Sequence, residues 1–139
     1  ILRELSEQHA LLPYLLPLLL FTFKYKFTSK GSMAYRILKT AVFERKFAKL
    51  SPDVQRAIGK MKDKMKENPF SGKPLRYDFF REKKLGKFRV YYLIYEEYLI
   101  LYMITISEKK DQQVAINTVM QFLDIYRKEV EEWVKQNKS

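Results

Sequence analysis

The sequence predicts an α+β fold, in which an N-terminal strand and a helical hairpin pack on a curved antiparallel sheet of about four strands, followed by a C-terminal helix. The main observation is the stretch 85–107, LGKFRVYYLIYEEYLILYMITIS, where two runs of aliphatic and aromatic residues are separated by Glu96 and Glu97. Such residues favour strands, and each run is about as long as an ordinary strand or slightly longer. The second observation is helical periodicity on both sides of this stretch, at 41–67 and at 112–136.

Residues 1–32 differ from the rest of the chain and are expected to be an appendage to a domain that spans 33–139. Positions 1–12 have helical spacing, Pro13 and Pro17 interrupt it, and 21–28 alternate aromatic residues with lysine and threonine as an edge strand does. The apolar part is too short to cross a membrane and lacks the features of a signal peptide. The polar linker 28–32, followed by Met33, suggests a fused partner peptide or a tag, and the alternative is a native N-terminal arm.

Local signals place three elements before the central hairpin. A short strand is predicted at 34–40 and a helix at 41–50. A second helix begins at Ser51, Pro52 and Asp53, because a serine cap followed by proline in the first turn is typical of a helix start, and Asn68 and Pro69 end it. Methionines at helical spacing in this second helix are expected to pack in the core.

The last part of the chain continues the sheet and closes it with a helix. Residues 70–74 are predicted to be a loop and 75–84 a strand, and the hairpin follows with central strands that helices cover on one face and that are partly shielded on the other. From 112 to about 136 an apolar stripe at helical spacing predicts one long helix.

The charge of the domain indicates which kind of partner it contacts. The chain has 139 residues and a formal net charge of +11, and positions 56–89 hold 12 lysines and arginines against four acidic residues. A basic face is expected of a protein that contacts phosphates. The alternative for the lysine-rich helix is a solvated face that only keeps the protein soluble.

Composition also excludes several kinds of chemistry. Cysteine is absent and His9 is the only histidine, so disulfides, thiolate nucleophiles, zinc sites and histidine-based triads are ruled out. Phosphate-binding and dinucleotide-binding glycine motifs are missing as well. We therefore expect no metal and no cofactor, and any catalysis must use lysine, arginine, tyrosine or carboxylates. The absence of cysteine is compatible with the cytoplasm.

The order of these elements and several short motifs resemble the RelE/ParE superfamily of bacterial and archaeal toxins, over residues 33–127. The resemblance is strongest to the archaeal RelE-like branch, in which the last strand ends in Lys-Lys and a helix follows. The matching motifs are Lys46, Lys49-Leu50, Ser51-Pro52, Asn68-Pro69, Lys73-Pro74-Leu75, Gly86-Lys87-Phe88-Arg89-Val90-Tyr91-Tyr92 and Lys109-Lys110-Asp111.

This resemblance implies the toxin of a type II toxin-antitoxin module. RelE-like toxins cleave messenger RNA on the ribosome, ParE-like members inhibit DNA gyrase, and an antitoxin protein neutralises both. The implied partners are a cognate antitoxin, the ribosome and mRNA, without a membrane or a small-molecule cofactor. Residues 1–28 look like an antitoxin segment, because a strand can add to an open sheet edge.

The resemblance also implies a cationic pocket sized for a phosphodiester. Arg89 of the G-x-F-R motif and Arg81 are expected to clamp the phosphate, since the guanidinium fork matches its oxygens. Lys83, Lys109 or Lys110 are expected to act as base or acid if neighbouring cations lower the pKa. The expected RNA-binding residues are Lys73, Arg76, Lys84 and Lys87.

One departure from the pattern keeps other functions open. Many nucleolytic members carry a tyrosine after the basic cluster, where this chain has Gln112-Gln113-Val114-Ala115 and only Tyr126 further on. Tyr126 is expected to be a core residue, and for Arg89 the alternative is a structural salt bridge. The alternatives to a ribosome-dependent endoribonuclease are a non-catalytic ParE-like gyrase inhibitor and a non-toxic RNA-binding relative.

Overall fold

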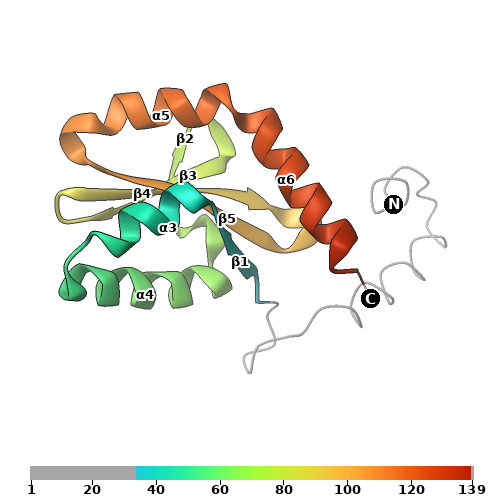
Figure 1. The fold of residues 1–139 in the computed structure, drawn as a ribbon, viewed down its shortest axis with the longest axis horizontal. Coiled ribbons are helices and arrows are strands. Elements are labelled where there is room, and N and C mark those ends of the chain that lie inside the picture. Colours follow the sequence, from blue (N-terminus) through green and yellow to red (C-terminus); the bar gives the residue numbers. More distant parts are fainter. Residues whose placement is uncertain (1–33, 139) are drawn as a thin grey trace. The chain divides into compact units, whose positions relative to one another are not determined.

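The computed structural model describes residues 34–138, which form three layers with a five-stranded sheet in the middle (Figure 1). Helices α3 (Ala41–Ala48) and α4 (Pro52–Glu67) cover one face of the sheet, and α5 (Gln112–Gln121) and α6 (Leu123–Gln136) cover the other. The expected α+β class is confirmed. The expectation of a partly shielded second face was wrong, because α5 and α6 pack across it.

The sheet has one strand more than expected, and one pair is parallel. Its order is β1 (Arg36–Lys39), β5 (Ile100–Glu108), β4 (Phe88–Tyr95), β3 (Tyr77–Leu85) and β2 (Lys73–Leu75). β1 runs parallel to β5, while the other three pairs are antiparallel. Helices α3 and α4 connect β1, at one edge of the sheet, to β2, at the opposite edge.

Each residue from Val90 to Tyr95 contributes to one of two cores, according to its position in the strand. Val90, Tyr92 and Ile94 pack with Phe43, Ile58 and Met65 against α3 and α4. Tyr91, Leu93 and Tyr95 pack with Ile116, Val119 and Val130 against α5 and α6. Because both faces of these strands are buried, nearly every position is apolar, which explains the nearly continuous apolar runs of β4 and β5.

Both helices of the hairpin begin at a side-chain cap. Thr40 Oγ1 accepts a hydrogen bond from the backbone N of Phe43, and Ser51 Oγ accepts one from Val54 N. The Ser51 cap with Pro52 in the first turn was predicted. Thr40 also donates to the carbonyl oxygen of Ile104 at 2.7 Å, so this cap fixes α3 to β5 as well.

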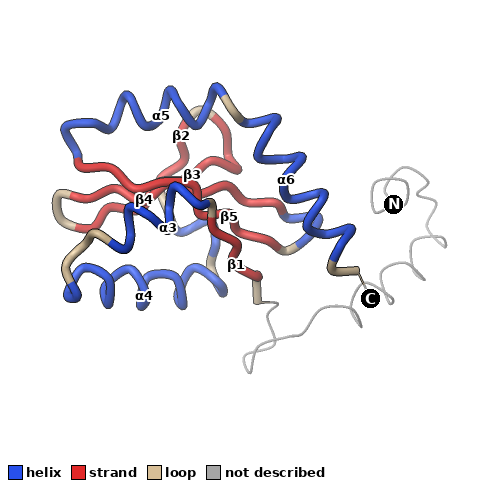
Figure 2. The backbone as a smooth tube through the Cα atoms, in the orientation of Figure 1, coloured by secondary structure: helices blue, strands red, loops and turns tan. Residues whose placement is uncertain are grey.

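The single C-terminal helix expected from the sequence is two helices. Phe122 separates α5 from α6 with non-helical backbone angles (φ −111°, ψ 18°), and Figure 2 shows the short loop at this point. The apolar stripe continues across the break because both segments cover the same face of the sheet. Periodicity therefore predicted the buried face and missed the bend.

The region 70–84 also differs from expectation. Residues Pro69–Ser71 form a 3₁₀ turn and Lys73–Leu75 form the edge strand β2, where a loop was predicted. Arg76 then adopts a left-handed backbone conformation (φ +46°) and turns the chain into β3. The predicted strand 75–84 is therefore interrupted at its second residue.

The turn at Gly86 sets the register of the hairpin between β3 and β4. Gly86 has φ +58°, a conformation that glycine adopts readily, and Leu85 pairs with Phe88 across the two-residue turn. Lys84 therefore lies opposite Arg89, and Glu82 lies opposite Tyr91. Directly opposed residues share a face, so this turn decides which charged side chains meet.

Buried tyrosines predict that the protein loses stability in alkali. Burial raises the pKa of Tyr91, Tyr92, Tyr95 and Tyr102. In the unfolded chain these phenols ionise near pH 10, while in the folded state they stay protonated, so the stability they contribute is present below about pH 10 and falls as the pH rises above it. Urea unfolding at pH 8 and at about pH 11 should show a lower midpoint in alkali, with tyrosinate absorbance appearing as the protein unfolds. Ionisation of all tyrosines at the ordinary pKa in the folded protein would contradict this.

Two further features of the sequence are the absence of a membrane span and the N-terminal appendage. No helix among residues 34–138 is long and apolar enough to cross a membrane. The predicted helix, edge strand and linker of the appendage at 1–32 lie outside the residues that the structure describes.

Candidate nucleic-acid site

Basic residues from four separate elements meet in one open pocket of about 600 Å³ beside the turn that joins β3 and β4. The cations that line it are Lys73, Lys83, Lys84, Arg89 and Lys109, and the other lining residues are Ser71, Gly72, Glu82 and Gln112. Five cations against one carboxylate give the pocket a strong positive charge. We call it the cationic pocket.

Arg89 is the buried cation of the cationic pocket, with 5% of its surface exposed. It projects from β4 on the side of α5 and α6, as Tyr91 does. Its Nη1 donates to the carbonyl oxygens of Gly86 at 2.9 Å and Phe88 at 3.0 Å. Nε and Nη2 make no hydrogen bond to any described residue, and no described carboxylate forms an ion pair with this guanidinium. The salt-bridge alternative for Arg89 is therefore not what the structure contains, and half of the guanidinium fork is available to a ligand.

The lysines reach the cationic pocket from three directions. Lys84 lies opposite Arg89 in the hairpin, and Lys73 comes from the edge strand β2. Lys83 Nζ donates to Ser71 Oγ at 3.2 Å, which places this ammonium at the rim. Lys109 follows β5, and its backbone N donates to the carbonyl oxygen of Lys87 at 2.7 Å, so the end of the last strand is fixed to the turn.

Four of the nine expected site residues lie outside the cationic pocket, and three of these four, Lys87, Lys110 and Arg76, are exposed on the surface. Lys110 is exposed and lies 4.0 Å from Glu108, which Lys87 also approaches at 3.7 Å. Arg76 occupies the turn between β2 and β3, at the far end of β3 from Lys83 and Lys84.

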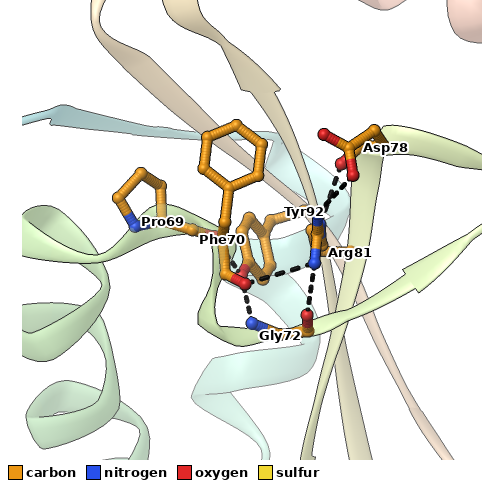
Figure 3. Close-up of polar contacts among 6 residues, drawn as sticks. All are labelled: Pro69, Phe70, Gly72, Asp78, Arg81 and Tyr92. Atoms are coloured by element: carbon orange, nitrogen blue, oxygen red, sulfur yellow. Dashed lines mark hydrogen bonds and ion pairs between the residues drawn. The ribbon is translucent and has the colours of Figure 1, made fainter.

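Arg81 was expected to clamp a phosphate, and the structure corrects this placement. Its side chain is 10% exposed and points to the face of the sheet that α4 covers, together with Tyr92, its partner in the register. The guanidinium donates to the carbonyl oxygens of Gly72 at 2.8 Å and Phe70 at 3.2 Å, and to both the carbonyl and the carboxylate of Asp78 (Figure 3). Arg81 lies opposite Tyr92, and Arg89 is three positions before Tyr92 in β4. Because side chains alternate between the two faces along a strand, Arg81 and Arg89 project from opposite faces.

Arg81 and Tyr92 together hold the segment 69–72, which forms one wall of the cationic pocket. Tyr92 Oη donates to the carbonyl oxygen of Pro69 at 2.6 Å and accepts a hydrogen bond from Gly72 N at 3.2 Å (Figure 3). A Cβ at Gly72 would lie 2.7 Å from Tyr92 Oη and 2.9 Å from the carbonyl oxygen of Glu82, so only glycine fits. This buried network positions Gly72 and Lys73 for the pocket.

Sequence analysis missed Glu82 and Gln112. Glu82 is 5% exposed, lines the cationic pocket and accepts a hydrogen bond from Gln112 Nε2 at 2.5 Å. Gln112 is the first residue of α5. A signal for Glu82 was present: if the turn at Gly86 is taken as a two-residue hairpin turn, Lys84 and Glu82 lie on the face of Arg89.

The downstream tyrosine does not reach the pocket. Tyr126 packs edge-to-face on Tyr102, with ring centroids 6.1 Å apart, in the core under α6. This agrees with its expected core role. Tyr91, which is fully buried, hydrogen bonds to Ser107 Oγ at 2.9 Å and lies behind Arg89 and Glu82 on the same face. Among residues 34–138 no group of three or more histidine, cysteine or acidic side chains is arranged to hold a metal.

Comparison with known proteins bears on the fold. No protein-family model and no curated protein matches the sequence. Three solved structures from Escherichia coli are similar: a double arginine-to-alanine mutant of the toxin RelE in the free state (TM-score 0.57, 19% identity, 64% of this chain and 98% of that one), the isolated RelE toxin (0.52, 18%, 64% and 99%), and the intact RelBE toxin-antitoxin complex (0.51, 19%, 54% and 96%). The RelE-like fold expected from the sequence is confirmed.

Proposed function

We propose that this protein is the toxin of a type II toxin-antitoxin module and that it cleaves messenger RNA on the ribosome. The observation that carries the proposal is the cationic pocket, in which a buried Arg89 with a half-free guanidinium is surrounded by four lysines. The RelE-like fold supports it, because the similar structures are RelE toxins. An arginine is expensive to bury without a carboxylate partner, and a phosphate is the anion whose oxygens match its planar fork.

The chemistry required is transfer of the RNA phosphate from the 5′-oxygen of one nucleotide to the 2′-oxygen of the preceding one. Negative charge builds up on the phosphate oxygens as the 2′-oxygen attacks. Arg89 and the lysine ammonium groups of Lys84 and Lys109 would stabilise this charge inside a partly enclosed site, where fixed donors are more effective than water. The reaction needs no metal and no cofactor.

The wider basic surface would hold the RNA strand. Lys73 and Lys83 border the cationic pocket at the sheet edge, and Lys87 is exposed at the turn beside it. Contacts of this kind with phosphates are independent of sequence and weaken with salt. Arg76 lies further along β3, so its contribution to RNA binding would concern nucleotides away from the cleaved bond.

An antitoxin partner would fit a second feature, a mostly apolar groove beside β5. β1 covers β5 only from Ile100 to Met103, so within the described residues 104–108 have no strand on that side. The groove there is bordered by α3 and α5 and includes Val42, Leu50, Ile106, Val114 and Phe122. A partner that adds a strand to this edge and packs apolar side chains in the groove would use ordinary peptide-recognition physics. We propose residues 1–32 as a segment of this antitoxin type.

The test is a cell-free translation reaction with bacterial ribosomes, given either the full chain or residues 33–139, followed by mapping of transcript 5′ ends. The expected result is arrest of translation with new 5′ ends that appear only on ribosome-bound mRNA. The shorter chain should act more strongly if residues 1–32 are antitoxin-like. Arrest without any new transcript ends would contradict the nuclease proposal.

Two measurements on the same samples separate the alternative functions. A DNA gyrase supercoiling assay detects the ParE-like activity. The supporting observation for this activity is that residues 112–115 are Gln-Gln-Val-Ala and include no tyrosine. Filter binding of RNA at increasing salt, without cleavage, would be the result for a non-toxic RNA-binding relative.

A further inference from the structure

Among residues 34–138, Glu82 is the one acidic residue that lines the cationic pocket, and its surroundings are unusual for a carboxylate. It is 5% exposed, and a buried carboxylate is costly unless it is paired. Its Oε2 accepts a hydrogen bond from Gln112 Nε2 at 2.5 Å, while Oε1 accepts none from the described residues. No described lysine or arginine is within ion-pair distance of it. One oxygen is therefore held in place and the other is left to accept a hydrogen bond from a ligand.

The register of the sheet sets the distance between Glu82 and Arg89. Glu82 lies opposite Tyr91 in β4 and Lys73 in β2, and Lys84 lies opposite Arg89. Glu82 and Arg89 are thus diagonal neighbours on one face, and such positions are about 7–8 Å apart. Both side chains line the cationic pocket, so a bound RNA would place a ribose 2′-hydroxyl toward the carboxylate and the adjacent phosphate toward the guanidinium.

From this geometry, and resting on the proposed function, we infer that Glu82 is the general base of RNA cleavage and that Gln112 is its positioning residue. An ionised carboxylate only accepts hydrogen bonds and protons, whereas an ammonium group already carries its proton and acts as an acid. This assignment replaces the expectation that a lysine takes the proton. A carboxylate then removes the proton from the 2′-hydroxyl, and a lysine ammonium group gives a proton to the leaving oxygen.

The reaction is then balanced within the cationic pocket. Glu82 takes the proton of the 2′-hydroxyl, and the 2′-oxygen forms a bond to phosphorus. The bond from phosphorus to the 5′-oxygen breaks, and a lysine ammonium, with Lys109 the candidate because it faces the pocket from the end of β5, gives a proton to the leaving oxygen. The products are a 2′,3′-cyclic phosphate and a 5′-hydroxyl, with no oxidant, reductant or metal required.

The experiment compares the full chain with its Glu82→Gln variant on ribosomes bound to a short mRNA, under single-turnover conditions. The amide has the shape of the carboxylate and removes the base. We expect cleavage to fall by about 10²–10⁴-fold, with affinity for the programmed ribosome unchanged or higher, because a negative charge near the RNA has been removed. The parent's cleavage rate should rise with pH as the base ionises, and this acidic limb should be absent from the variant.

Three further variants make the assignment specific. Glu132→Gln, on the exposed side of α6, makes the same change in charge far from the pocket and should cleave as the parent does. Glu82→Asp keeps a carboxylate and should keep the acidic limb at a reduced rate. Gln112→Leu removes a donor to the charged carboxylate, which should move the acidic limb to higher pH. Thermal unfolding of each variant checks that the fold is kept.

The outcomes distinguish this inference from the function on which it rests. If the parent does not cleave mRNA, the proposed function fails. If the parent cleaves and folded Glu82→Gln cleaves at the same rate with the acidic limb intact, Glu82 is not the base and only this inference is overturned. If Glu82→Gln is unfolded, a normal rate without an acidic limb in Glu82→Asp overturns it as well.

Discussion

Replacing Arg89 with alanine is expected to reduce ribosome-dependent mRNA cleavage by about 10²–10³-fold and to relieve translation arrest. Arg89 is the buried cation of the cationic pocket, and in the part of the chain that the structure describes only its Nη1 has hydrogen-bond partners, the carbonyl oxygens of Gly86 and Phe88. The N–H groups of Nε and Nη2 would bind the phosphate as negative charge develops on its oxygens. Arg89→Lys keeps the charge and loses the fork, so its rate should lie between those of the parent and the alanine variant.

The control for Arg89 is Lys128→Ala, which removes one positive charge from the exposed side of α6. Cleavage, ribosome affinity and the urea midpoint should all be measured for the three variants and the parent. A folded Arg89→Ala protein that arrests translation as strongly as the parent would remove Arg89 from the site, and with it the present assignment of the cationic pocket. Equal losses in Arg89→Ala and Lys128→Ala would indicate a general effect of net charge.

Replacing Arg81 with alanine is expected to lower the free energy of unfolding by about 2–4 kcal/mol. The ion pair with Asp78 contributes little of this, because the aspartate is 79% exposed and exposed pairs are worth at most about 1 kcal/mol. The larger cost comes from the carbonyl oxygens of Gly72 and Phe70, which lose their donor in the interior (Figure 3). The stacking of the guanidinium on the Phe70 ring, 5.0 Å away, is lost as well.

Asp78→Asn is the matched variant for Arg81. It removes the exposed partner and leaves the backbone contacts of Arg81 in place, so its unfolding free energy should fall by less than about 1 kcal/mol. Urea unfolding followed by circular dichroism measures both variants. Equal stability of Arg81→Ala and the parent would mean that the network in Figure 3 does not hold the pocket wall. A loss of cleavage in Arg81→Ala at full stability would return Arg81 to the catalytic site.

Some elements could be predicted because their signals are local. The apolar runs of β4 and β5, the Ser51 cap with Pro52, and the apolar stripes of the helices each depend on residues a few positions apart. Arg89 could be recognised as a candidate for a related reason, since a guanidinium within a strand of apolar residues needs a partner or a ligand. None of these inferences required knowledge of where distant segments lie.

The pairing of distant strands could not be predicted in this way. The parallel alignment of β1 with β5 joins residues 64 positions apart, such as Arg36 and Ile100, and backbone hydrogen bonds do not depend on side-chain identity. The same holds for Arg81 and Arg89, which look alike in the sequence. A difference of one position in strand register puts Arg81 against the turn that holds Phe70 and Gly72, and Arg89 in the pocket.

By itself, therefore, the sequence determined the fold class, the helices with their buried faces, and the positive charge of the segment around the hairpin, because each depends on local periodicity and composition. Only the tertiary structure decided which charges share a site. It brought Lys73, Arg89 and Lys109 together, assigned Arg81 to the interior, and placed Glu82 and Gln112 in contact. The physical reason is that the face and the neighbours of a strand residue are set by register and pairing, which arise from the packing of the whole domain.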